Sequence, residues 1–236
     1  MGKRYTELSD KHMQFIREQK LFFVGTATAD SRVNISPKGM DSFKVLGPAR
    51  VAWLNVTGSG NETAAHVRIA PRMTIMFCAF VGSPLILRLY GNARVVHPGD
   101  ADWPDLFGKF RPLPGARQIF DVEIDLVQTS CGMAVPFFDY AGEREQLSDW
   151  AEKQGEDGIR RYWQDKNQLS IDGLPTYIVE KAVEIAEYKP RFACQTAKYA
   201  EYKPRFVFQS SVNRPLVRLG CYPVSLPSSI ASPFWR

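Results

Sequence analysis

Two stretches in the first third of the chain carry residues that could bind an anionic ligand. Arg32 and Lys38 place two cations within seven residues, and residues 57–63 form a loop of Gly, Ser, Asn and Thr around one Glu. Backbone N–H groups in such a loop, and at the start of a helix that follows it, suit an anion such as phosphate. The same composition also fits a simple turn with a helix cap, so the loop alone leaves both interpretations open.

Other kinds of reactive site find little support in the sequence. The three histidines and four cysteines are scattered, without the spacing of a metal site or of a nucleophile beside its base. No Gly-Lys-Ser/Thr follows the loop glycines, and no G-x-G-x-x-G follows a strand, so the common nucleotide-binding fingerprints are missing. We therefore expect no protein-bound metal and assign no catalytic residue.

The hydrophobic pattern predicts the elements that would carry these residues. Short runs rich in β-branched and aromatic residues, with turn signals between them, indicate antiparallel strands. The runs lie at residues 21–27, 32–35, 51–56, 73–80, 85–96 and 119–128. Helical patterns occupy residues 8–20, 62–67 and 147–166. Gly91, inside the fifth run, predicts a bulge or a close approach of another backbone. The expected fold class is mainly β with flanking helices.

The order of these pieces resembles the pyridoxamine 5′-phosphate oxidase-like family of flavin-binding split β-barrels. In that family a strand with Arg-x-x-x-x-Lys or a near relative lies along the flavin. The next strand ends in aromatic-x-Asn, and the loop after it holds the phosphate. The matching segments are Arg32-Val33-Asn34-Ile35-Ser36-Pro37-Lys38, then Trp53-Leu54-Asn55, then residues 57–63. The resemblance covers residues 8–176 and implies a six-stranded antiparallel split β-barrel of the FMN-binding type.

The resemblance also implies which residues bind the cofactor, FMN. Arg32 or Lys38, together with the loop, would hold the phosphate, because cations and loop N–H groups both suit it. The implied set is Arg32, Val33, Asn34, Ser36, Lys38, Trp53, Asn55, Thr57, Ser59, Gly60, Asn61 and Thr63. The family's C-terminal Arg-x-His substrate pattern has no counterpart in this sequence, so pyridoxamine phosphate is not supported as the substrate.

From this resemblance we expect an FMN-dependent oxidoreductase that acts on an unknown small substrate, with the flavin as the redox centre. The resemblance further implies a homodimer with the cofactor at the subunit interface. Two alternatives stay open. The same fold could bind flavin, haem or a deazaflavin without turnover, or the chain could act in protein interactions through its C-terminal part.

Composition and charge set the wider context. The net charge of +5 is mild and no dense Lys/Arg run occurs, so nucleic acid is not an expected partner. The N-terminus is too polar for a signal peptide and no apolar run is long enough for a membrane span, so we expect a cytoplasmic protein. One domain is expected over residues 1–176. The extension, residues 177–236, carries AEYKPRF at 186–192 and 200–206 and is expected to be poorly ordered.

Overall fold

The computed structural model describes residues 2–179 of the 236-residue chain. Nearly all of the predicted C-terminal extension, including both AEYKPRF copies, lies outside the described residues. Eight strands are present: β1 (Lys3–Tyr5), β2 (Phe22–Thr26), β3 (Asn34–Lys38), β4 (Phe43–Gly47), β5 (Arg50–Val56), β6 (Arg72–Cys78), β7 (Ile86–Val96) and β8 (Ala116–Ser130). The helices are α1 (Asp10–Glu18), α2 (Glu62–Ile69), α3 (Trp103–Phe107) and α4 (Gln146–Lys166).

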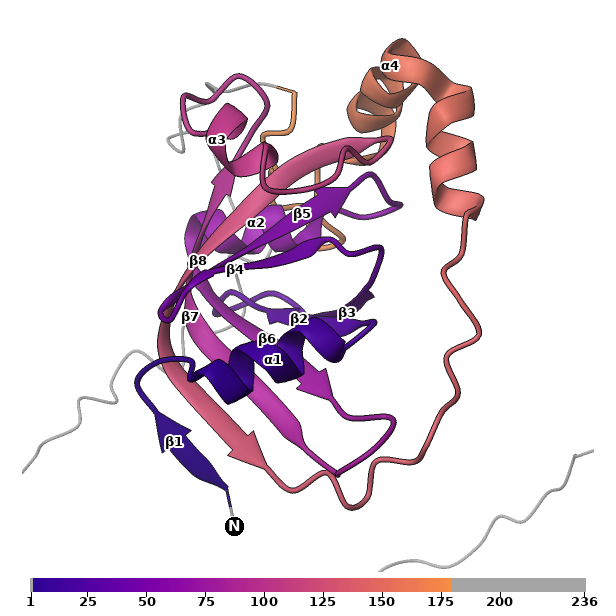
Figure 1. Ribbon diagram of the computed structural model, residues 1–236. Helices are drawn as coiled ribbons and strands as arrows, with labels where there is room; N and C mark the ends of the chain where they lie inside the picture. The colour runs from indigo at the N-terminus through magenta and orange to yellow at the C-terminus, as the bar shows by residue number, and fades with distance from the viewer. Residues whose placement is uncertain (1, 180–236) are drawn as a thin grey trace, which may run out of the picture. The chain divides into compact units, whose positions relative to one another are not determined.

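All strands pair antiparallel in a single sheet of order β3-β2-β6-β7-β8-β5-β4, with β1 beside β8. The sheet curls, so strands from its two ends approach each other near α1 (Figure 1). Phe22 on β2 meets Phe43 on β4, with ring centroids 4.9 Å apart, across the opening of the barrel. The predicted class, a mainly β split barrel with flanking helices, is confirmed.

The strand count differs from the predicted six, because β1 and β4 carry weak sequence signals. β1 is three residues long and fully exposed, so no apolar alternation marks it. β4 is only partly buried along its length and lies in a stretch that the turn residues made look irregular. β3 also begins later than predicted and runs to Lys38. It includes Pro37, which is tolerated because β3 lies at the end of the strand order.

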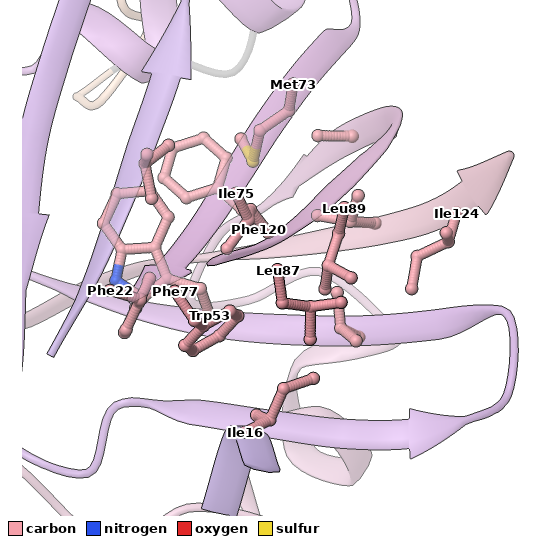
Figure 2. Packing of buried hydrophobic residues seen from close by; sticks show 14 of the residues in the cluster. Ile16, Phe22, Trp53, Met73, Ile75, Phe77, Leu87, Leu89, Phe120 and Ile124 are labelled. Carbon is pink, nitrogen blue, oxygen red and sulfur yellow. The ribbon is translucent and has the colours of Figure 1, made fainter. Parts of the chain in front are cut away.

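The core fills the inside of the curled sheet. Phe22, Trp53, Ile75, Phe77 and Phe120 pack together there, as Figure 2 shows. The ring of Trp53 stacks on that of Phe120 at 4.7 Å between centroids.

A second apolar cluster, with Leu54, Leu106 and Ile119, lies on the opposite face of β5 and β8 under α3. β5 is therefore buried on both faces, which makes it a firm base for the loop that follows it. None of the described helices is long and apolar enough to cross a membrane.

Gly91 confirms the predicted bulge and close approach. The β7–β8 register shifts between Tyr90 and Gly91, and a Cβ at position 91 would lie 2.0 Å from the Glu123 carbonyl oxygen. We expect Gly91→Ala to lower the free energy of unfolding by about 1–3 kcal/mol, because the β8 backbone must move. Gly47→Ala is the matched control, since a Cβ there meets nothing within 4 Å. Urea denaturation should separate the two variants, and equal stability would contradict the role given to Gly91.

Candidate functional site

A pocket of about 340 Å³ lies between β3, the end of β5 and the loop that leads into α2. Its lining consists of Asn34, Ser36, Lys38, Trp53, Asn55, Val56, Gly58, Ser59, Gly60, Asn61, Glu62, Thr63 and Arg117. Nine residues predicted for cofactor binding are brought together here: Asn34, Ser36, Lys38, Trp53, Asn55, Ser59, Gly60, Asn61 and Thr63. Arg32, Val33 and Thr57 lie outside this lining.

The pleat of β3 explains which of its residues reach the pocket. Side chains alternate along a strand, so Asn34, Ser36 and Lys38 share one face. Val33 and Ile35 point the other way and are both 69% exposed. Asn34 Nδ2 donates to Thr63 Oγ1 at 3.2 Å, which ties β3 to the first turn of α2.

The start of α2 presents unused hydrogen-bonding groups to the pocket. Asn61 is the N-cap residue, yet its side chain makes no cap hydrogen bond. Its amide is buried, and neither Oδ1 nor Nδ2 has a partner among the described residues. The first N–H groups of a helix also lack intrahelical acceptors, so this end offers donors to an incoming anion.

Arg117, on β8, is the most unusual residue of the pocket. It is 2% exposed, and no carboxylate among the described residues pairs with it. Its Nη1 donates to Asn167 Oδ1 at 2.6 Å and its Nη2 to the Gly60 carbonyl at 3.1 Å, while Nε has no partner in this part of the chain. The Asn55 amide satisfies its neighbours when its oxygen and nitrogen exchange places. Its oxygen then accepts from Arg117 Nη2 at 2.9 Å. Burial lowers the pKa of Arg117 to about 9.

Lys38 is the second cation of the pocket. Its ammonium lies 5.1 Å from the centroid of the Trp53 ring, a cation–π contact. Burial, and then the charge of Arg117, lower its pKa to about 8. The pocket also contains Glu62, but its carboxylate accepts from the Ile171 N–H at 3.0 and 3.1 Å. Two cations therefore share a small polar space, and no carboxylate of residues 2–179 is bonded to either.

Two of the three predicted residues outside the lining, Arg32 and Thr57, have other partners. Arg32 has an exposed side chain and forms an ion pair with Asp172, which also accepts from the Arg32 N–H at 2.8 Å. Thr57 is buried; its hydroxyl donates to the Gly115 carbonyl and accepts from Trp163 Nε1, each at 2.8 Å. Thr57 thus fixes the start of the loop. Of the two cations that the sequence placed beside the loop, Lys38 lines the pocket and Arg32 does not, and Arg117 lies in the lining in addition.

Sequence reasoning missed Arg117 because the predicted strand began at Ile119, which left position 117 in a loop. β8 begins at Ala116, two residues before Gln118, and Arg117 is buried there like the residues that follow it. A cation two residues before the predicted strand is a signal that could have identified it. His66, near the pocket, bonds Thr26 Oγ1 through Nδ1 at 3.2 Å. Over residues 2–179 no group of three His, Cys, Asp or Glu side chains is placed to hold a metal ion.

Comparisons with known proteins agree with the order of motifs. The sequence model of pyridoxamine 5′-phosphate oxidase matches residues 8–131. The pyridoxamine 5′-phosphate oxidase family protein ustO of Aspergillus flavus is 36% identical over 191 residues, which cover 72% of this chain and 76% of that protein.

Solved structures with similar folds include a putative pyridoxamine 5′-phosphate oxidase from Lactobacillus delbrueckii. It is 23% identical, with a TM-score of 0.44, and the match covers 52% of this chain and 94% of that one. The FAD binding protein from Mycobacterium smegmatis is 19% identical, with a TM-score of 0.39 over 53% of this chain and 97% of that one. On the strength of the sequence match over residues 8–131 and of the Aspergillus relative, the chain belongs to the pyridoxamine 5′-phosphate oxidase family.

Proposed function

We propose that this chain binds FMN in the pocket of Lys38 and Arg117 and acts as an FMN-dependent oxidoreductase on a small substrate. The observation that carries the proposal is the buried guanidinium of Arg117, which has no carboxylate partner among the described residues. Buried charges in proteins are normally paired, because leaving water without a counter-charge is costly. A phosphate group would supply the missing charge to Arg117 and to Lys38.

The groups around the two cations fit a phosphate ester. The unpartnered amide of Asn61 and the first N–H groups of α2 would donate to, or orient, its oxygens. Arg117 would donate through Nε, and Lys38 would contribute a second positive charge. Asn34, Ser36 and Asn55 line the rest of the pocket and offer hydrogen bonds to a ribityl chain or to a ring edge.

The flavin, when bound, would supply the redox chemistry itself. The protein's part is then to bind, orient and tune, which agrees with the lining of the pocket. None of the described residues that line it is a cysteine or a histidine. Reduction of the bound flavin by NAD(P)H and its reoxidation by oxygen would separate an oxidoreductase from a carrier of the same fold.

We also propose that the protein is a homodimer with the cofactor near the subunit interface. β3 is an edge strand. The exposed Ile35 on its outward face, and Val33 just before it, line a hollow of about 520 Å³. Exposed apolar side chains on an edge strand favour association with another surface. Because the other face of β3 lines the phosphate pocket, a partner docked on this strand would lie close to the cofactor.

Native mass spectrometry of the purified protein tests the cofactor and the dimer together. We expect a complex of two chains and two FMN molecules, and release of FMN on denaturation. Haem or a deazaflavin in place of FMN would contradict the FMN proposal and favour the binding role. A monomer that holds FMN would contradict the dimer alone.

The roles of the two arginines can be separated by substitution. Arg117→Met should weaken FMN binding about tenfold or more, because one charge-assisted contact contributes roughly 1.5–3 kcal/mol. Arg32→Met is the matched control, since Arg32 lies outside the pocket and faces Asp172. We expect it to change the dissociation constant less than about threefold, because the exposed Arg32 side chain does not line the pocket. Isothermal titration with FMN decides, and a larger loss in the Arg32 variant would place the phosphate elsewhere.

FMN binding should also depend on pH through Lys38. With its pKa lowered to about 8, Lys38 loses its positive charge as the pH rises through that value. Affinity should therefore be highest near neutral pH, where a phosphate ester with a second pKa of about 6 is doubly charged, and fall above about pH 8. Lys38→Met should bind less tightly at neutral pH and lack the fall at about pH 8. Titrations from about pH 6 to 9 measure this, and a flat profile for the unchanged protein would contradict it.

A further inference from the structure

Asn167, at the end of α4, is fully buried, and both polar atoms of its side chain bond residues that line the pocket of Lys38 and Arg117. Its Oδ1 accepts from Arg117 Nη1 at 2.6 Å, and its Nδ2 donates to the Gly58 carbonyl at 3.0 Å. One amide therefore holds both the buried cation and the loop that precedes α2. Its own backbone is fixed as well, because its N–H donates to the Trp163 carbonyl and its carbonyl accepts from Thr176 Oγ1.

Asn167 belongs to residues 163–176, which we call the clasp. The clasp follows the long connection after β8 and lies beyond residues 8–131, the part of the chain that the family's sequence model matches. Two more hydrogen bonds join the clasp to the residues around the pocket. Trp163 Nε1 donates to Thr57 Oγ1, and the Ile171 N–H donates to the Glu62 carboxylate. Figure 1 shows α4 beside the end of β5. The segment that follows α4, in orange, passes near α2.

The choice of an amide at this position has a physical consequence. A neutral oxygen can hold the guanidinium in place while leaving its positive charge for a ligand. A carboxylate of the same shape would hold Arg117 equally well but would neutralise it, and it would add a negative charge next to the incoming phosphate.

We propose that Asn167 is a positioning residue that keeps Arg117 oriented and electrostatically available for the phosphate group of the ligand. The proposal rests on the proposed function in taking FMN as that ligand. It assigns to the clasp, which the family's sequence model does not include, the task of orienting the cation of the phosphate site. Asn167 acts through Arg117 and Gly58, and its side chain is not among the residues that line the pocket.

The test compares FMN with riboflavin, which has the same ring and ribityl chain but no phosphate. In the full-length Asn167→Asp variant we expect FMN affinity to fall about tenfold or more, because the nearest cation is neutralised. Riboflavin affinity should change less than about threefold, since riboflavin carries no charge for that cation to attract. Thr176→Val is the matched control, because it removes a buried hydrogen bond of the clasp without altering the Asn167 side chain. Its ratio of FMN to riboflavin affinity should equal that of the unchanged protein.

Each outcome bears on one claim. If Asn167→Asp leaves both affinities unchanged, or lowers both equally, the ratio of FMN to riboflavin affinity stays the same and the positioning role is overturned. An equal loss of both is the result expected of a merely structural residue. Should circular dichroism show that this variant does not fold, Asn167→Ser replaces it. There Arg117 loses its acceptor but keeps its charge, so FMN affinity should fall while riboflavin affinity is kept, and an unchanged ratio again overturns the role. If the unchanged protein binds FMN no better than riboflavin, the proposed phosphate site itself is wrong.

Discussion

A buried guanidinium, with which no carboxylate in the described part of the chain pairs, is the constraint around which this site is built. Neutral oxygens of Asn167, Gly60 and, with its amide turned, Asn55 accept from Arg117 without cancelling its charge. Burial at such a position disfavours the charged form, which is why the pKa of Arg117 falls to about 9. Lys38 shares the pocket and is affected in the same direction. Burial therefore disfavours the charged form of both cations, which costs the empty protein some stability. An anionic ligand would offset that cost.

The rest of the structure serves to hold that state in place. β5 is buried on both faces, so the loop that leaves its end starts from a fixed point. Thr57 fastens the loop to Gly115 and to Trp163. Asn34 fastens β3 to α2 from the other side. In the proposed function, a loop held by these contacts loses less conformational entropy when it binds a phosphate.

Much of this arrangement was predictable from the sequence, because it depends on local order. Asn34, Ser36, Lys38, Asn55 and four residues of the loop were placed at one site from the order of the motifs, and all of them line one pocket. The pleat of β3 selects alternate residues, so Val33 lies outside the lining although Asn34 belongs to it. Arg32 has a positive charge and lies next to the predicted motif, but its side chain pairs with Asp172, which is distant in the sequence.

The remainder depends on contacts between distant parts of the chain, which no local pattern records. Arg117 reaches Gly60 across 57 residues, and Asn167 reaches Gly58 across 109. Short or half-buried strands such as β1 and β4 give no clear alternation, so they were missed for a different reason. The order of residues within a motif can be inferred from the sequence. The contacts that a later segment makes with that motif can be identified only from the folded structure.

The central claim is that buried cations bind the ligand's phosphate as a dianion. The most direct measurement is the ³¹P NMR shift of FMN bound to the protein as the pH is lowered. A free phosphate ester takes up a proton with a pKa of about 6. Held by Arg117, Lys38 and the α2 N-terminus, the bound phosphate should stay doubly charged, so its shift should remain constant from about pH 8 down to about pH 5. A bound phosphate that titrates near pH 6, as free FMN does, would contradict this account.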